Sequence, residues 1–213
     1  MNEQERLLNA YVLAHTEPES ELLAQLDHQA HVQLLHPRMV SGHLQGRLLS
    51  AISHMIRPHR ILELGTYVGY SALCLAEGLA KDGQLVTIDR DDEIEDFARD
   101  YIERSPYAEC IDFRIGDALQ LLPSIDGPFD LVFIDADKRE YKQYYDLVID
   151  KVPQGGYILA DNTLWDGKVV EPLQRGDRQT QGLLEFNDYV AADARVEKFI
   201  LPLRDGITII RKK

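Results

Sequence analysis

Apolar positions near the start of the chain recur at close to helical spacing, which predicts a helix with one buried face over residues 21–35. These positions are Leu22, Leu23, Leu26, Ala30, Leu34 and Leu35. Pro37 ends this helix, because the residue before a proline disfavours helical backbone. A second helix is predicted over residues 44–56 and stops before Pro58. We therefore expect residues 1–57 to form an N-terminal helical cap.

From residue 60 onwards, short apolar runs alternate with helical patterns. The predicted strands are residues 60–64, 85–89, 111–115, 131–135, 157–160, 197–201 and 207–211. The predicted helices are residues 71–80, 93–105, 118–122, 140–151 and 180–193. Strands separated by helices require crossover connections, which predict an α/β fold with a parallel sheet covered by helices on both faces. The last two strands are joined only by residues 202–205, so that pair should be antiparallel. We expect one domain over residues 1–213, with residues 58–213 as its core.

Composition limits the classes of partner. The 213 residues are 45% hydrophobic and 28% charged, which is ordinary for a globular domain. The formal net charge of −13 argues against a broad nucleic-acid surface, since such surfaces use Lys and Arg to neutralise phosphates. Cys74 and Cys110 lack metal-ligand spacing, and we expect both to be buried, reduced thiols in the cytoplasm. Residues 1–15 do not resemble a signal or transit peptide, and no stretch has the ~20 apolar residues of a membrane helix.

The sharpest local pattern is the run ILELGTYVGYS at residues 61–71, an apolar strand followed by a glycine turn and a helix. Gly65 and Gly69 allow a tight turn and let a ligand lie against the main chain. Their spacing differs from the GxGxxG fingerprint of dinucleotide sites. Glu63 places a carboxylate where a pyrophosphate would otherwise sit, which favours a cationic ligand group such as the amino group of a methionine moiety. The alternative is a turn with a purely structural role.

Acidic residues also follow the next two predicted strands. Asp89 ends the second strand, and an acid at that place in a doubly wound sheet commonly accepts ribose hydroxyls. Its structural alternative is a cap for the following helix. Asp117 and Ala118 follow the third strand, where a ligand beyond the strand ends would present its base.

Three oxygen-bearing side chains follow the fourth and fifth strands. They are Asp135, Asp161 and Asn162, and the carboxyl ends of neighbouring parallel strands would bring them together. Two carboxylates and an amide suit Mg²⁺, with Ca²⁺ or Mn²⁺ as substitutes, and zinc is disfavoured because no Cys or His joins them. Helix capping is the alternative for each acid alone. Lys138, three positions after Asp135, would act as a general base beside a bound cation.

Together these motifs resemble the cation-dependent O-methyltransferase family, which includes the caffeoyl-CoA and catechol O-methyltransferases. The resemblance extends from residue 39 to residue 211 and rests on ELGTYVGYS at 63–71, DADK at 135–138, DNTLW at 161–165 and DGIT at 205–208. It implies the Rossmann-like class I methyltransferase fold, with seven strands and a C-terminal antiparallel pair. It also implies S-adenosylmethionine as cofactor, a divalent cation and a homodimer.

The resemblance implies roles for individual residues. Glu63 and Ser71 would hold the methionine end of the cofactor, with Gly65 and Thr66 supplying close backbone. The other implied cofactor contacts are Met39, Ser41, Asp89, Asp117, Ala118, Asp135 and Asp137. The residues that match the metal ligands are Asp135, Asp161 and Asn162. Those that match the catalytic residues are Lys138 and Asp135.

The acceptor implied by the resemblance is a small molecule with two vicinal oxygens, such as a catechol, bound to the cation. Asp166 stands where plant caffeoyl-CoA enzymes usually carry a substrate-contacting Asn. Residues 167–180, which would border the acceptor pocket, are rich in charge. A CoA thioester is therefore not implied.

Two other activities remain open from the sequence. Family members also methylate a hydroxylated uridine in tRNA, and Lys168, Arg175 and Arg178 could contact RNA, although the net charge of −13 disfavours this. A nicotinamide-dependent oxidoreductase would use a similar sheet, but Glu63 and the acidic–amide metal set argue against it.

Overall fold

The computed structural model describes residues 3–213, in which seven strands form one sheet with the order β3-β2-β1-β4-β5-β7-β6. The strands are β1 (Arg60–Leu64), β2 (Gln84–Asp89), β3 (Ile111–Ile115), β4 (Leu131–Ile134), β5 (Tyr157–Ala160), β6 (Val196–Leu201) and β7 (Ile207–Lys212). Strands β1 to β5 pair in parallel, and β7 runs antiparallel between β5 and β6. The expected class I methyltransferase fold and its antiparallel C-terminal pair are thus confirmed.

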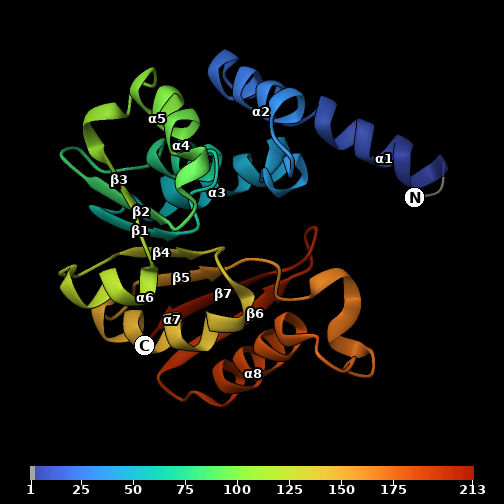
Figure 1. Cartoon of the computed structure of the whole chain (residues 1–213), viewed down its shortest axis with the longest axis vertical. Helices are drawn as coiled ribbons and strands as arrows, with labels where there is room; N and C mark the ends of the chain where they lie inside the picture. Colours follow the sequence, from blue (N-terminus) through green and yellow to red (C-terminus); the bar gives the residue numbers. More distant parts are fainter. Residues whose placement is uncertain (1–2) are drawn as a thin grey trace.

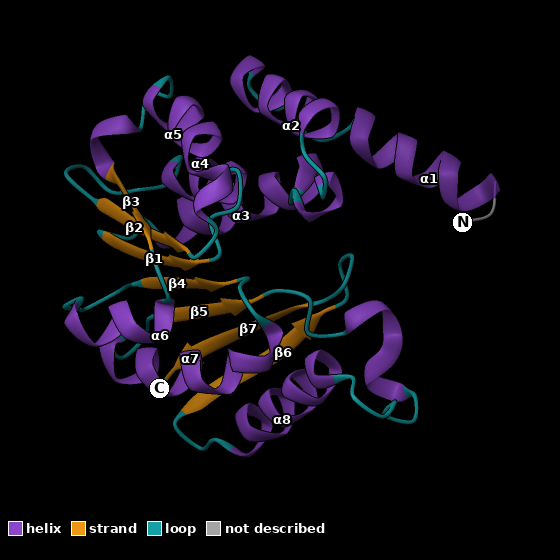
Figure 2. Cartoon of the chain, in the orientation of Figure 1, coloured by secondary structure: helices purple, strands orange, loops and turns teal. Residues whose placement is uncertain are grey.

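Helices cover both faces of the sheet, as Figures 1 and 2 show. One face carries α2 (Glu21–Gln33), α3 (Gly42–Ile56), α4 (Tyr70–Ala76) and α5 (Glu95–Glu103). The other carries α6 (Ala118–Leu121), α7 (Tyr141–Val148) and α8 (Arg178–Ala192). The short 3₁₀ turns are η1 (Pro37–Met39), η2 (Asp92–Ile94), η3 (Ala108–Cys110), η4 (Leu122–Ser124), η5 (Lys138–Glu140), η6 (Ile149–Lys151) and η7 (Trp165–Val170). Helix α1 (Glu3–Ala14) extends away from the body and has no buried residue.

Alternation along the strands divides the apolar core into two layers. In β1, Ile61 belongs to the cluster under α2 to α5, whereas Leu62 and Leu64 belong to the cluster under α6 to α8. Because side chains alternate along a strand, Glu63 shares the face of Ile61. A carboxyl group is therefore buried on the apolar α4 side of the sheet, at the end of β1.

Some predicted helices were longer than the helices in the structure. The helix predicted over residues 71–80 is α4, which ends at Ala76. The chain turns there to bring Gly78 against α3, where an added Cβ would lie 2.3 Å from the backbone nitrogen of His54. Both cysteines are free thiols and Cys74 is buried, as predicted, but Cys110, the last residue of the turn η3, is partly exposed. No helix in residues 3–213 is long and apolar enough to cross a membrane.

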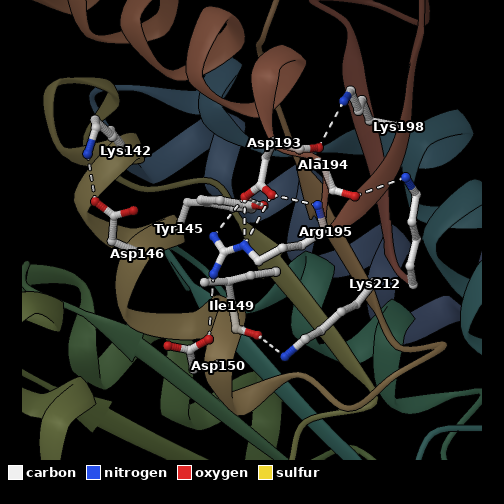
Figure 3. A network of polar contacts seen from close by, with 11 residues as sticks. Lys142, Tyr145, Asp146, Ile149, Asp150, Asp193, Ala194, Arg195, Lys198 and Lys212 are labelled. Atoms are coloured by element: carbon white, nitrogen blue, oxygen red, sulfur yellow. Dashed lines mark hydrogen bonds and ion pairs between the residues drawn. The ribbon is translucent and has the colours of Figure 1, made fainter.

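The C-terminal end of α8 is joined to α7 and β6 by a polar network around Asp193 (Figure 3). Its carboxylate accepts hydrogen bonds from the Tyr145 hydroxyl at 2.9 Å and from the Arg195 guanidinium at 2.7 Å. The Arg195 backbone nitrogen donates to the same carboxylate at 2.8 Å. The network fixes the connection between α8 and the edge strand β6.

Candidate functional site

A cavity of about 550 Å³ opens at the carboxyl ends of the parallel strands. The predicted site residues in its wall are Met39, Ser41, Gly65, Thr66, Ser71, Asp89, Asp117, Ala118, Asp135, Asp137, Lys138, Asp161 and Asn162. Of the predicted set, Glu63 lies fully buried beneath the wall and Asp166 lies outside it. The crevice beyond the strand ends, where the sequence predicted a ligand site, is therefore the site of the cavity.

The turn between β1 and α4 brings main chain directly to the cavity. Gly65 has a φ of +98° and Gly69 one of +83°, conformations that favour glycine. A Cβ atom on Gly65 would lie 2.2 Å from the carbonyl oxygen of Asp135. The turn can follow this path only because residue 65 lacks a side chain.

Glu63 ends a buried chain of polar groups. The Thr66 hydroxyl lies 2.5 Å from that of Thr87, which donates to Glu63 Oε2 at 2.5 Å. Glu63 Oε1 is buried and has no hydrogen-bond partner among residues 3–213. Burial raises the pKa of Glu63 to about 8, although hydrogen bonding from Ser71 and Thr87 opposes the shift. A buried carboxyl oxygen without a partner fits a cationic ligand group.

Two acids of the cavity wall are oriented by local backbone. Asp89 accepts from the backbone nitrogens of Tyr67 at 2.6 Å and Asp91 at 3.0 Å. Asp117 caps α6 by accepting from Leu119 N at 2.9 Å. Asp89 does not cap the following helix, the alternative that the sequence left open, because Asp91 is the N-cap of η2. Both acids also line the cavity, so a backbone contact and a ligand contact are compatible.

Asp137 is held by two arginines at the cavity wall. Its carboxylate lies 3.0 Å from Arg90 and accepts from Arg139 Nε at 2.8 Å. These contacts, Arg139 foremost, lower the pKa of Asp137 to about 2. Asp137 is therefore ionised at neutral pH, and its carboxylate joins the end of β2 to η5.

Asp135 and Asp161 lie side by side at the ends of two neighbouring strands. Ile134 of β4 is in register with Ala160 of β5, and the two aspartates are the residues that follow. Asp161 is 3% exposed, and burial together with the negative charge of Asp135 raises the pKa of Asp161 to about 7. Asn162 follows with a φ of +57°, in the left-handed region that Asn tolerates.

This donor set fits a hard divalent cation. It offers two carboxylates and an amide, all oxygen donors. A cation would also relieve the repulsion that disfavours charging both acids. No group of three or more His, Cys, Asp or Glu side chains suited to a metal is present in residues 3–213, so the amide of Asn162 is needed for a third side-chain ligand.

Lys138 lies between Asp135 and a buried tyrosine. Its ammonium donates to Asp135 Oδ1 at 2.6 Å and to the Tyr141 hydroxyl at 2.9 Å. Tyr141 also lies 3.0 Å from the carbonyl oxygen of Asp161. Burial and the charges of Asp135 and Asp161 raise the pKa of Tyr141 well above its usual range, so its hydroxyl is neutral. The lysine is therefore held in one place beside both aspartates.

Asp166, the predicted substrate residue, is exposed in η7 with a φ of +52°. Its carboxyl contacts Asp205, which lines the cavity. Burial, and then the charge of Asp166, raise the pKa of Asp205. A substrate role for Asp166 stays a prediction, and Asp205 is the member of the pair that lines the cavity.

Three residues that the sequence analysis did not select complete the site. Gln45 contacts Asp161, Tyr141 contacts Lys138, and Arg204 donates to the carbonyl oxygens of Val40 and Ser41. The contacts of Gln45 and Arg204 join segments distant in the sequence, whereas Tyr141 is only three residues from Lys138. Only the DGIT pattern immediately after Arg204 could have drawn attention to one of them.

The comparisons with known proteins agree with this geometry. A family model described as O-methyltransferase matches residues 13–213. Caffeoyl-CoA O-methyltransferase 1 of Arabidopsis thaliana is 38% identical over 179 residues, which cover 79% of this chain and 69% of the plant protein. Caffeoyl-CoA O-methyltransferase 2 of Eucalyptus globulus is also 38% identical over 179 residues, which cover 79% of this chain and 72% of the Eucalyptus protein.

Solved structures share the whole architecture. The O-methyltransferase TomG of Streptomyces achromogenes, solved with S-adenosylmethionine, has a TM-score of 0.92 at 30% identity, with full coverage of both chains. The O-methyltransferase of Bacillus cereus, solved with S-adenosylhomocysteine (SAH), has a TM-score of 0.90 at 29% identity and covers 97% of each chain.

Proposed function

The chain belongs to the O-methyltransferase family, and we propose that it moves the methyl group of S-adenosylmethionine to one hydroxyl of a catechol-like small molecule with a divalent cation. One observation carries this proposal. Lys138, Asp135 and Asp161 line the same cavity as the glycine turn above Glu63. Groups suited to a cofactor and groups suited to an ionising hydroxyl thus share one space. The nicotinamide alternative finds no support in the family assignment.

The cofactor would lie between the glycine turn and the end of β3. Glu63 Oε1, the buried oxygen without a partner, would accept from the cofactor's amino group, with Ser71 beside it. Asp89 would bind the ribose hydroxyls, and Asp117 with Ala118 would flank the adenine. The remaining cofactor contacts are proposed for Met39, Ser41, Gly65, Thr66, Asp135 and Asp137. When bound, the cofactor supplies an electrophilic methyl group on its sulfonium.

The cation would be held by Asp135, Asp161 and Asn162. When bound, it supplies Lewis acidity to the acceptor oxygens, with Mg²⁺ the first choice and Ca²⁺ or Mn²⁺ as substitutes. Lys138 would accept the hydroxyl proton once it has lost its own. Its ammonium is already fixed by Asp135 and Tyr141, so the base would not need to be ordered during the reaction.

The acceptor is proposed to be a small phenol with two neighbouring oxygens. Trp165 and Tyr144 line the cavity and offer aromatic surface to such a ring. The plant relatives are named for a CoA thioester. Asp166 stands where the plant enzymes usually carry Asn, and the loop after it is rich in charge, so the proposal does not extend to a CoA thioester.

A homodimer is proposed from the N-terminal helix. Helix α1 exposes Leu7, Leu8, Tyr11 and Leu13, at 66%, 61%, 62% and 44%. Several large apolar side chains exposed on one helix are typical of an interaction site. A second copy of the chain would cover it, and sedimentation velocity tests this directly. A cytoplasmic location is proposed from the free thiols of Cys74 and Cys110.

An assay with methyl-labelled S-adenosylmethionine tests the acceptor. The purified full chain is offered catechols, flavonoids, hydroxycinnamoyl thioesters and tRNA, each with Mg²⁺ and with chelator. Labelled product is expected with catechols and only in the presence of the cation. Product on tRNA alone would support the hydroxyuridine alternative, and absence of product on every catechol would refute the phenol assignment.

A further inference from the structure

A buried amide from the N-terminal cap contacts one of the proposed metal ligands. Gln45 Nε2 donates to Asp161 Oδ2 at 2.5 Å, across 116 residues of sequence. Gln45 is 2% exposed and Asp161 is 3% exposed. A polar side chain this deeply buried normally makes a specific hydrogen bond, and here its partner is a carboxylate of the site.

Close helix packing leaves Gln45 little freedom. The next residue, Gly46, lies so near α4 that an added Cβ would come 2.7 Å from the ring of Tyr70 and 2.8 Å from the sulfur of Cys74. One turn further along α3, Leu49 is fully buried. Helix α3 is therefore fixed against α4, and its position fixes where the amide of Gln45 can point.

The two oxygens of Asp161 are oriented by different donors. Oδ1 accepts from the backbone nitrogen of Asn162 at 2.8 Å, and Oδ2 accepts from Gln45. Both donors are neutral, so they set the rotation of the carboxylate without neutralising its charge. Lys138, by contrast, pairs its positive charge with Asp135. Within residues 3–213 each carboxylate oxygen of Asp161 accepts one hydrogen bond, which leaves lone pairs for a further ligand.

We propose that Gln45 is a positioning residue that holds the Asp161 carboxylate in the orientation needed to bind the divalent cation. This inference rests on the proposed metal site. Outer hydrogen-bond partners of metal ligands commonly change metal affinity about 10–100-fold when they are removed. Loss of the Gln45 donor should therefore act on metal affinity in particular, beyond its cost to the fold.

The test measures Mn²⁺ binding to the full chain by isothermal titration calorimetry with SAH present. Gln45→Met keeps the length of the side chain but cannot donate, and Gln45→Leu is a second such variant should the first fold poorly. The control is Ser53→Ala, which removes a fully buried hydroxyl of the same helix that donates to Leu75 O at 2.6 Å. Ser53 has no contact with Asp161 among its hydrogen bonds in residues 3–213.

We expect Gln45→Met to weaken Mn²⁺ binding about tenfold or more, while its SAH affinity stays within about twofold of wild type. Ser53→Ala should lower the melting temperature but leave Mn²⁺ affinity unchanged. Unchanged Mn²⁺ affinity in the Gln45 variants, or an equal loss in Ser53→Ala, would overturn the positioning role. Asp161→Asn distinguishes failure of the positioning role from failure of the proposed metal site. If wild type binds Mn²⁺ and Asp161→Asn binds it equally well, the proposed metal site itself is wrong. A wild-type chain that binds no Mn²⁺ would overturn both.

Discussion

Gly65 lies directly against the main chain of Asp135, so that a Cβ atom on residue 65 would come to 2.2 Å from the Asp135 carbonyl oxygen. The turn after β1, where we propose the cofactor binds, and the end of β4, where we propose the cation binds, thus meet through their backbones. Neither can move without the other, which explains how one cavity keeps the two groups of side chains in register.

Gly65→Ala should therefore damage both parts of the site. The substitution adds a steric clash to a φ of +98°, and we expect a loss of about 3–5 kcal/mol in the free energy of unfolding. Gly155→Ala is the matched control, because Gly155 has a φ of +83° with nothing within 4 Å of an added Cβ. It should cost about 1–2 kcal/mol. Urea unfolding measures the free energy of unfolding of both variants. Equal losses would show that the contact between Gly65 and Asp135 adds no steric cost.

Glu63→Gln should weaken cofactor binding yet stabilise the cofactor-free protein at alkaline pH. Folding raises the pKa of Glu63 from 4.5 to about 8, so the folded state binds the proton more tightly. The stability linked to this proton is fully present below pH 4.5 and is lost progressively as the pH rises to about 8.

The measurement is the melting temperature of the cofactor-free wild type and Glu63→Gln between these two pH values. Their difference should change in favour of Glu63→Gln as the pH rises. SAH affinity should fall about tenfold or more, since a charge-assisted hydrogen bond is lost. A pH-independent difference in melting temperature would show that Glu63 is not the titrating group.

Lys138→Met should lower kcat about 10²–10⁴-fold, the usual contribution of general acid–base catalysis. SAH binding should be largely retained, because Lys138 is not among the proposed cofactor contacts and donates instead to Asp135 and Tyr141. Lys142→Met serves as control: Lys142 pairs with Asp146 on the surface at 2.7 Å and should leave turnover unaffected. Steady-state kinetics with saturating cation measure kcat for both variants. A Lys138→Met enzyme with wild-type kcat would show that Lys138 is not the general base.

Asp193→Asn should destabilise the fold without affecting the chemistry. Arg195 and Tyr145 hold the pKa of Asp193 well below its usual range, so the stabilisation is present above the unfolded pKa and is lost as the pH falls from there through the lower folded pKa. We expect a cost of about 1.5–3 kcal/mol near neutral pH, which shrinks on acidification. Asp150→Asn is the control, since Asp150 is 84% exposed and 3.7 Å from Arg195. Chemical unfolding at neutral and acid pH compares the free energies of unfolding of the two variants. Equal losses in the two variants would show that the Asp193 network does not stabilise the fold.

The parts of the fold that the sequence predicted are those set by local pattern. The seven strands and the turn at Gly65 were readable because alternation and glycine placement are properties of neighbouring residues. The strand ends at Asp135 and Asp161 followed from the topology of a parallel sheet. Gln45 could not be found this way, because a polar residue in an amphipathic helix normally faces water and its partner is 116 residues away.

The position of Asp166 shows a second limit. The DNTLW motif located the end of β5 correctly, but the main chain then passes through left-handed conformations at Trp165 and Asp166. These direct Asp166 to the surface and leave Asp205 in the cavity wall. This path of the main chain accompanies a close contact between Gly206 and Leu164. A Cβ atom added to Gly206 would lie 2.4 Å from the Leu164 side chain. A contact across 42 residues leaves no local pattern in the sequence.

The dependence of methyl transfer on a cation held by Asp135 and Asp161 is the core of the proposed function. Its most direct test is labelled methyl transfer to a catechol by wild type and Asp161→Ala, each in chelator and after Mg²⁺ is restored. Wild type should lose turnover in chelator and regain it with Mg²⁺, whereas Asp161→Ala should bind SAH but stay inactive in both. Full activity of Asp161→Ala in chelator would show that methyl transfer needs no cation held by Asp161.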